Sequence, residues 1–396
     1  MEDVAGLKIT YARPPIAERR VNGRAAAFPS CVTIDLGALA FNIRWIKAKV
    51  GGDVALMAVL KADAYGHGAT ELARAALQNG ADLLAVANMA EALELREAHI
   101  DAPILLLSYV PAEDIPTAIE HDLRITVFDD ACAARCISAT VHGGGTLKIH
   151  VKVDTGMGRM GVLPQAMHAL CRQLQDAPGI TLEGLYTHFA TADDDPAYMR
   201  EQLNIFNRVQ SELRGEGIGF KYIHAANSAA LLNGGDSYFN VVRPGVLLYG
   251  LEPMARSGFA DQIRPVMSWK TQIAQVKTLP PDSMVGYGNA YRTRGWETIA
   301  VAPVGYADGL RRTPYSWREV LIHGRRAPLV GRVSMEKITI NVSHIPGVAV
   351  GDEVVLMGRQ GDDCISADEI AAWLHSNNYE VVTSIAPRVP RTYINW

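Results

Sequence analysis

The segment 55–87, ALMAVLKADAYGHGATELARAALQNGADLLAVA, contains the pattern from which the fold can be predicted. It opens with the apolar run Ala55–Leu60, which has the length of a buried strand, and continues into a polar turn. Ala69–Leu77 follows, with apolar residues three and four positions apart as on one face of a helix. Leu83–Ala87 is a second apolar run. A strand, a helix and another strand predict two parallel strands joined by a helical crossover.

The same alternation extends from Cys31 to about Gly250. Apolar runs of strand length occur nine times in this region, at Val32–Ile34, Ala55–Leu60, Leu83–Ala87, Ile104–Leu107, Ile125–Phe128, Leu147–Val153, Ile180–Leu185, Tyr222–Ile223 and Val241–Leu248. Segments with helical spacing lie between them. The repetition predicts an α/β fold with an N-terminal (β/α)₈ barrel of the TIM type. Nine runs are one too many for eight strands, so one terminal run belongs elsewhere.

The pattern changes after about Pro253. Strand-like runs then follow one another without regular helices between them, at Trp269–Lys277, Thr298–Val304, Glu319–Ile322, Ile338–Val342 and Glu353–Met357. One helical segment, Ala367–Leu374, closes the chain. We therefore predict an N-terminal extension (1–29), a barrel domain (30–263) and a mostly β C-terminal domain (264–396).

The composition excludes several classes of protein. The chain has 396 residues, with 38 Lys and Arg against 42 Asp and Glu, and 48% of it is hydrophobic. Disordered chains have the opposite composition, with low hydrophobicity and high net charge. Acidic and basic residues are interspersed, so the sequence offers no basic face for nucleic acid, and we expect no such partner.

Cysteine usage and the length of the apolar runs predict the compartment. The five cysteines are odd in number and scattered, which indicates neither a disulfide framework nor a paired-cysteine metal site. The longest apolar runs fall short of the roughly 18 residues that a membrane helix needs. Charged residues interrupt the first 30 positions, unlike a secretory signal. We expect a cytoplasmic protein without a membrane partner or a metal ion.

Polar side chains follow several of the predicted strands, where barrel enzymes collect their functional groups. Lys61 comes directly after Ala55–Leu60, and a lysine in such a pocket can become a nucleophilic or basic amine. His188 and His224 stand near the ends of two later strands. Arg243 lies within an apolar run, where an unpaired guanidinium would be very costly, so it needs an acceptor.

A second interpretation is a dinucleotide site. Gly156, Gly158 and Gly161 spell GxGxxG after a strand, and Glu183 follows at the spacing of the acidic residue that binds ribose. However, the strand is a late member of a repetitive series, and Asp154 adjoins the turn where a pyrophosphate would lie. We therefore do not favour a dinucleotide site.

Several segments together resemble the alanine racemase family of pyridoxal 5′-phosphate enzymes. They are Lys61–Gly68, Asp154–Gly161, Tyr186–Ala190, Asn227–Ala229, Arg243–Gly245, Val285–Gly288, Gly305–Gly309 and Asn378–Glu380, and the resemblance covers about residues 30 to 394. It implies a cofactor-binding barrel and a β-rich domain that takes the first strand. It also implies a homodimer whose active sites are shared between subunits, and a role in supplying D-alanine, a cell-wall precursor.

The resemblance also implies how the cofactor is held. Lys61 would bind it covalently, and Arg243 would donate a hydrogen bond to the pyridine nitrogen, which would stay unprotonated because arginine keeps its proton. The other residues implied at the cofactor, most of them around its phosphate, are Tyr65, His188, Asn227, Ser228, Gly245, Val246 and Tyr379.

Racemisation needs an acid–base group on each face of the substrate. The resemblance implies Lys61 for D-alanine and Tyr287, from the partner subunit, for L-alanine. Arg159 would bind the substrate carboxylate and, with His188, assist the tyrosine. Lys152 aligns with a lysine that family members often carry as a carbamate, which would orient Arg159.

Other aligned residues bear on specificity. Tyr306 and Tyr379 would narrow the entry passage, and the backbone N–H of Met335 would contact the substrate carboxylate. Glu336 departs from the family pattern, which generally has aspartate at this position. The expected activity is alanine racemisation. The alternatives are a racemase of serine or other small amino acids, a pyridoxal-phosphate decarboxylase of the same fold, and a cofactor-binding regulator without turnover.

Overall fold

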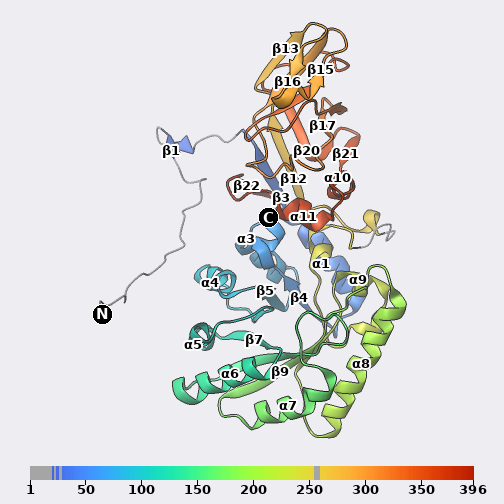
Figure 1. The fold of residues 1–396 in the computed structure, drawn as a ribbon. Coiled ribbons are helices and arrows are strands. Elements are labelled where there is room, and N and C mark those ends of the chain that lie inside the picture. The colour runs from blue at the N-terminus through green and yellow to red at the C-terminus, as the bar shows by residue number, and fades with distance from the viewer. Residues whose placement is uncertain (1–19, 22–23, 26–28, 254–258) are drawn as a thin grey trace. The chain divides into compact units, whose positions relative to one another are not determined.

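The structure is a computed structural model that describes residues 20–21, 24–25, 29–253 and 259–396 (Figure 1). The chain forms two compact units. The barrel unit combines Ile34–Ser268, Ser366–Thr383 and Tyr393–Trp396; the β unit contains Trp269–Ile365, Ser384–Thr392 and the described residues up to Thr33. Most of the predicted extension 1–29 lies outside the described residues. Because each unit joins separate stretches of sequence, the predicted boundary between 263 and 264 stays a prediction.

The barrel unit is built on a closed barrel of parallel strands, in the order β10-β11-β4-β5-β6-β7-β8-β9. Their bounds are β4 (Ala55–Val59), β5 (Leu83–Val86), β6 (Ile104–Leu106), β7 (Leu123–Val127), β8 (Leu147–Lys152), β9 (Ile180–Tyr186), β10 (Tyr222–His224) and β11 (Val241–Val242). The parallel pairing of Val241 with Ala55 closes the ring. The predicted barrel is confirmed, and eight of the nine apolar runs supply its strands.

Helices surround this barrel (Figure 1). They are α1 (Leu36–Val50), α3 (Ala69–Gln78), α4 (Met89–Glu97), α5 (Ile115–Glu120), α6 (Asp130–Gly143), α7 (Met167–Asp176), α8 (Pro196–Gly215) and α9 (Ser228–Asn233). Side-chain caps fix several of their starts: Asp35, Asn88 and Asp129 each accept a hydrogen bond from a backbone N–H in the first turn. Among the described residues, no helix is both long and apolar enough to cross a membrane.

The ninth apolar run pairs in the main sheet of the β unit. Its main sheet has the order β18-β17-β20-β12-β3-β22, with β21 paired to β20; a second sheet has the order β13-β16-β19, and β14 pairs with β15. The bounds are β3 (Cys31–Asp35), β12 (Met267–Gln272), β13 (Gln275–Leu279), β14 (Met284–Val285), β15 (Tyr291–Arg292), β16 (Glu297–Ala302), β17 (Glu319–Ile322), β18 (Arg325–Pro328), β19 (Ile338–Asn341), β20 (Glu353–Gln360), β21 (Asp363–Ile365) and β22 (Arg391–Ile394). The remaining described strands, β1 (Arg20–Val21) and β2 (Arg24–Ala25), pair with each other. The surplus run is therefore β3, and the mostly β second region is confirmed.

Three element predictions were wrong in detail. Val241–Leu248 is a strand only over its first two residues, because Pro244 has no N–H for a ladder and the chain turns at Gly245. Trp269–Lys277 spans two strands that enter different sheets, β12 and β13. The helix predicted at the end, α10 (Ala367–Leu374), is followed by an unpredicted one, α11 (Asn378–Thr383), which is too short to show a helical period.

Candidate active site

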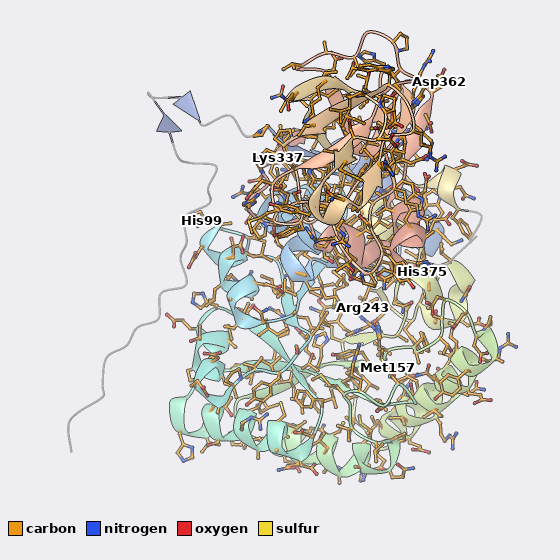
Figure 2. All side chains as sticks on the ribbon, turned by 45° about the horizontal axis from the view of Figure 1, so that its top comes forward. His99, Met157, Arg243, Lys337, Asp362 and His375 are labelled. Carbon is orange, nitrogen blue, oxygen red and sulfur yellow. The ribbon has the colours of Figure 1, made fainter. Side chains whose placement is uncertain are left out.

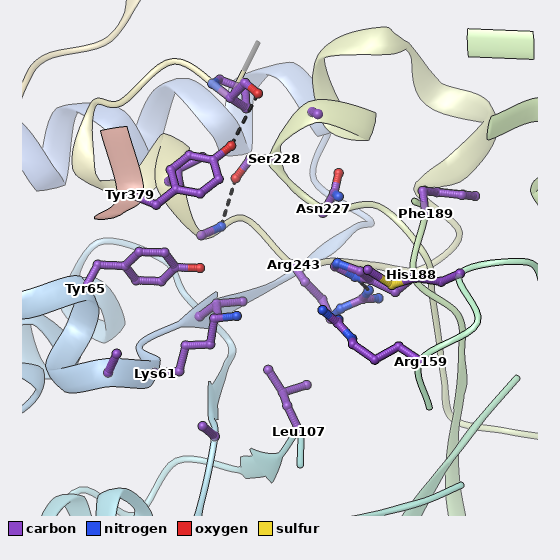
Figure 3. Close-up of a pocket in the computed structure, with 18 of the residues that line it drawn as sticks. Lys61, Tyr65, Leu107, Arg159, His188, Phe189, Asn227, Ser228, Arg243 and Tyr379 are labelled. Atoms are coloured by element: carbon purple, nitrogen blue, oxygen red, sulfur yellow. Dashed lines mark hydrogen bonds between the residues drawn. The ribbon is translucent and has the colours of Figure 1, made fainter. Parts of the chain in front are cut away.

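A cavity of about 730 Å³ lies in the barrel unit, which is within the usual size range of small-ligand sites (Figure 3). Many of the residues singled out in the sequence line it: Lys61, Tyr65, Lys152, Arg159, His188, Asn227, Ser228, Arg243, Gly245, Val246 and Tyr379. Several of them stand just after barrel strands, where the fold directs functional groups. The other predicted site residues, Tyr287, Tyr306 and Met335, belong to the β unit.

Lys61 begins an unusual left-handed turn, labelled α2 (Lys61–Gly66), directly after β4. Ala62 through Tyr65 have φ between 52° and 55°, although none of them is glycine. This conformation costs roughly 1–2 kcal/mol per residue, so contacts must hold it. The Glu91 carboxylate accepts hydrogen bonds from the N–H of Ala62 (2.8 Å) and of Ala87 (2.7 Å). Strained residues of this kind concentrate at functional sites.

The Lys61 side chain lines the cavity (Figure 3). Surrounding protein atoms and then the nearby positive charge of Arg159 lower its pKa below the ordinary lysine value, while Glu91 opposes this effect. A lowered pKa makes the neutral, nucleophilic amine more abundant near neutral pH.

Arg243 lies inside the barrel unit (Figure 2) and is 4% exposed. Its two terminal nitrogens are satisfied by protein. One donates to His224 Nδ1 (2.9 Å); the other donates to the Thr187 carbonyl (2.9 Å) and lies 3.2 Å from His188 Nδ1. The predicted need for an acceptor is thus met largely by the chain itself. Within the described part of the chain, no acceptor bonds the N–H of the third guanidinium nitrogen, Nε. Burial lowers the Arg243 pKa to about 10, so the guanidinium stays charged at neutral pH.

Hydroxyl and backbone N–H groups gather at another part of the cavity. Ser228 Oγ accepts hydrogen bonds from the N–H of Gly245 (2.9 Å) and of Leu247 (3.3 Å). A Cβ at Gly245 would lie 2.7 Å from the Tyr65 hydroxyl, so only glycine lets backbone and phenol approach this closely. Tyr379 lies beside them, with its hydroxyl on the Pro253 carbonyl (Figure 3). Burial raises the pKa of Tyr65 well above its ordinary value and that of Tyr379 to about 12, so both remain donors.

These groups fit the cofactor that the sequence resemblance implies. The Ser228 and Tyr65 hydroxyls beside Gly245 are donors that suit a phosphate ester, and the Lys61 amine suits an aldehyde. Arg243 Nε–H suits a neutral ring nitrogen. Asn227 contributes less directly, because its Oδ1 caps helix α9 by accepting the N–H of Ala230.

The rest of the lining carries charges of both signs, from the cations Lys152 and Arg159 and the carboxylates Asp193 and Glu380. Burial, followed by the charges of Arg159 and Arg243, lowers the Lys152 pKa to about 8. His188 is held neutral, since burial and neighbouring cations bring its pKa well below the ordinary value. Arg159 is exposed in the loop after β8. A substrate carboxylate would meet a suitable cation there.

The dinucleotide interpretation is not supported by the loop that suggested it. Asp154 Oδ1 accepts the N–H groups of Gly156 (3.0 Å), Met157 (3.0 Å) and Gly158 (3.1 Å), the donors that would otherwise hold a pyrophosphate. The second element of that motif, Glu183, is buried in an ion pair with Arg124.

In the β unit, Tyr306 and Met335 are brought together by backbone hydrogen bonds: Tyr306 N–H donates to Ser334, and Ala307 N–H to the Met335 carbonyl (3.1 Å). Tyr287 is 65% exposed, and the Arg312 guanidinium lies 5.7 Å from its ring centre.

Glu336, the residue that departs from the family pattern, is bound by Arg388. The same arginine also binds Asp308. The sequence analysis missed both Arg312 and Arg388, since no local motif marks a cation that acts from another element.

Family models match both regions of the chain. Residues 34–253 match the alanine racemase N-terminal domain, and residues 266–393 match the alanine racemase C-terminal domain. Alanine racemase from Desulfovibrio desulfuricans is 42% identical over 367 residues, which cover 92% of this chain and 98% of that protein. Alanine racemase from Methanococcus maripaludis is 40% identical over 371 residues, which cover 93% and 99%.

Solved structures give the same result. Alanine racemase from Bacillus anthracis with bound L-Ala-P has a TM-score of 0.87 at 40% identity, with 93% of this chain and 96% of that chain covered. Alanine racemase from Streptomyces lavendulae has a TM-score of 0.89 at 34% identity, with 94% and 98% covered. Both similarities extend over the barrel and the β-rich region alike.

Proposed function

The chain belongs to the alanine racemase family, whose members are isomerases, and on that premise we propose that it interconverts L- and D-alanine with pyridoxal 5′-phosphate. The two proposed acid–base groups are Lys61 of one subunit and Tyr287 of the partner subunit. The observation that carries the proposal is the arrangement of one cavity, in which the Lys61 amine and the Arg243 Nε–H share a lining with the hydroxyl donors for a phosphate.

The chemistry that pyridoxal phosphate supplies when bound is electron withdrawal from the Cα atom of an amino acid. Lys61, Tyr65, Ser228, Gly245 and Arg243 would hold it. Arg243 keeps its proton while donating from Nε, so the electron withdrawal stays moderate and return of a proton to the same carbon is favoured over other reactions.

Lys61 would hold or remove the Cα proton on one face, and its lowered pKa supports this because a neutral amine can accept a proton. On the opposite face we propose Tyr287 of the partner subunit. The Arg312 guanidinium lies 5.7 Å from the Tyr287 ring centre, and this cation–π contact would help to orient the phenol. Arg159 would bind the substrate carboxylate, with His188 nearby to assist proton movement.

Lys152 is proposed to carry a carbamate that orients Arg159. Its lowered pKa supports the modification, because the neutral amine is the form that reacts with carbon dioxide, releasing one proton. Carbon-13 NMR of the protein in labelled bicarbonate should then show one carbamate signal, which Lys152→Met removes.

We propose that the enzyme acts as a homodimer with shared sites and prefers alanine, with Tyr306 and Tyr379 restricting larger side chains and Met335 N–H contacting the carboxylate. The cytoplasmic location and the cell-wall role stay predictions. Racemisation of serine stays an alternative, because Glu336, which pairs with Arg388, stands where the family generally has aspartate.

Incubation of the purified protein and cofactor with L-alanine, followed by chiral chromatography, tests the proposal. D-alanine should accumulate to equal amounts with L-alanine, and L-serine should react more slowly. Release of carbon dioxide without D-alanine would instead identify a decarboxylase. Such an enzyme typically places a carboxylate at the pyridine nitrogen, where Arg243 is expected here.

A further inference from the structure

A row of buried, hydrogen-bonded side chains leads from Arg243 into the barrel interior. Arg243 lies 2.9 Å from His224 Nδ1, His224 Nε2 lies 2.8 Å from His150 Nδ1, and His150 Nε2 lies 3.4 Å from Glu183 Oε2. Both histidines are fully buried, and Glu183 is 6% exposed. None of the proposed catalytic steps uses His150, His224 or Glu183, yet burying this many polar groups is costly unless every one is satisfied.

The far end of the row is an ionised carboxylate. Glu183 also binds Arg124, whose Nε lies 3.0 Å from Oε2. Burial alone would raise the Glu183 pKa, but the hydrogen bonds from His150 and Arg124 outweigh it and bring the pKa to about 2. Arg124 in turn pairs with Asp122, which also binds Lys148 at the exposed edge of the barrel. Glu183 can therefore only accept hydrogen bonds.

An acceptor at one end fixes every proton along the row. Because Glu183 accepts, His150 must carry its proton on Nε2, and its Nδ1 presents a lone pair. His224 must then be protonated on Nε2 to donate to that lone pair, which leaves His224 Nδ1 as the acceptor for Arg243. A cationic imidazole at either position would put two N–H donors face to face. The row thus requires two neutral histidines with defined tautomers.

The surroundings of the two rings agree with this requirement. Tyr186 stacks on His224 with ring centres 4.7 Å apart, and Tyr222 stacks on His150 at 5.8 Å. Burial first, and then the charge of Arg243, lower the pKa of His224 well below its ordinary value; His150 is lowered too, by burial against an opposing effect of Glu183. The charged groups that face the pair are Arg243, Glu183 and Arg124. A Cβ at Gly184 would overlap the His150 ring, so this glycine makes room for it.

We propose that Glu183, acting through His150 and His224, positions the Arg243 guanidinium as the hydrogen-bond donor to the cofactor ring. The three are positioning residues, since Arg243 separates them from the cofactor. Without the relay, His224 can take the other tautomer and turn an N–H toward Arg243, which would displace the guanidinium. This inference rests on the proposed cofactor role of Arg243.

A pair of His150 variants tests the relay in the holoenzyme. His150→Phe keeps a flat ring but can neither accept nor donate, whereas His150→Gln can do both through its amide. Thr126→Val is the matched control: Thr126 is fully buried in the same barrel and hydrogen-bonds the Leu106 carbonyl (2.7 Å) and the Tyr186 hydroxyl (2.9 Å), but it is not part of the row.

We expect His150→Phe to lower kcat by about tenfold or more with little change in KM, and to shift the visible absorption band of the bound cofactor. His150→Gln should recover most of both, and Thr126→Val should change neither. Equal kcat and an unshifted band in His150→Phe would overturn the proposal, as would His150→Gln behaving like His150→Phe.

Nitrogen-15 NMR of histidine-labelled protein without cofactor gives a readout independent of turnover. His150 and His224 should both be neutral and protonated on Nε2 from about pH 5 to 9, a range that brackets the ordinary histidine pKa. Protonation of His224 on Nδ1, or titration of either ring within that range, would refute the relay even if His150→Phe fails to fold. If the tautomers are as expected but no alanine is racemised, the proposed function fails and the proton order stands.

Discussion

Lys61 is the residue whose surroundings most constrain the chemistry. Lys61 follows strand β4 and begins the left-handed turn, and burial and then the positive charge of Arg159 lower the pKa of its amine. The other lysine of the cavity, Lys152, is subject to the same physics more strongly. The sequence predicted only that these two lysines stand at the ends of strands. The sizes of the pKa shifts depend on neighbours from other strands.

Replacing Lys61 should remove the covalent link to the cofactor. We expect Lys61→Ala to lose the visible absorbance of lysine-linked pyridoxal phosphate, because no other amine stands at the end of β4. Absorbance spectra of the purified protein measure this directly. Lys47→Ala, which removes a surface lysine paired with Asp82, is the control and should keep the band. An unchanged band in Lys61→Ala would mean that another residue binds the aldehyde.

Lys152 predicts how stability depends on pH. Its folded-state pKa of about 8 lies below the ordinary value of 10.5, so folding disfavours the protonated form. This loss of folding stability is complete below pH 8, where Lys152 is protonated in both the folded and the unfolded state. It disappears as the pH rises toward 10.5. Lys152→Met should therefore increase the free energy of unfolding at pH 7 by up to about 3 kcal/mol, with the gain shrinking above pH 8.

Denaturant unfolding of the cofactor-free protein in buffer purged of carbon dioxide measures this difference. A Lys152→Met variant that is less stable than the parent at pH 7 would show that the lysine is not held against its charge.

At the scale of elements, hydrophobic periodicity predicted the barrel strands well and the turns poorly. A buried parallel strand has a continuous apolar run wherever it lies, so β4 to β10 follow from the sequence. The strand predicted at Val241–Leu248 was too long for the same reason. An apolar run indicates that a segment is buried, and the segment after β11 is buried without being extended. The left-handed turn Ala62–Tyr65 could not be predicted, because it contains no glycine and contacts from α4 hold it.

Glu91 of helix α4 supplies that support, which makes it testable. Both of its carboxylate oxygens accept backbone N–H groups, from Ala62 and Ala87, and an amide offers only one acceptor. Loss of a hydrogen bond to a charged group costs about 1.5–3 kcal/mol. We expect Glu91→Gln to weaken cofactor binding by about tenfold or more, measured by fluorescence titration. The control Glu97→Gln, on the same helix, should bind the cofactor as tightly as the parent does. Parental affinity in Glu91→Gln would show that the left-handed turn is stable without the Glu91 hydrogen bonds.

At the scale of the whole molecule, each of the two units combines separate stretches of sequence. The strand β3 precedes the barrel in sequence but pairs in the main sheet of the β unit, whereas α10 and α11 come near the end of the chain and belong to the barrel unit. The sequence analysis found one strand too many without showing which, since strand count is local information and pairing across the chain is not. Family resemblance supplied that assignment, and it also supplied Tyr287, which no pattern in the sequence marks as a base.

A shared active site predicts complementation between two inactive variants. In a mixed dimer of Lys61→Ala and Tyr287→Phe chains, one of the two sites combines an intact lysine with an intact tyrosine. Random mixing makes half of the dimers mixed, so activity should recover to about a quarter of that of the parent in the mixture and to about half in purified mixed dimers. Co-expression with two affinity tags and a racemisation assay test this. No recovery in purified mixed dimers would place both residues of a site on the same chain.

The central claim is that Lys61 and Tyr287 each handle one face of the substrate. Proton NMR of alanine incubated in D₂O with the Tyr287→Phe holoenzyme tests it most directly. We predict that D-alanine still exchanges its Cα proton for deuterium, since Lys61 serves that face, while exchange of L-alanine and racemisation fall by about 10²–10⁴-fold. Exchange of L-alanine at the rate of the parent enzyme would contradict the two-base account.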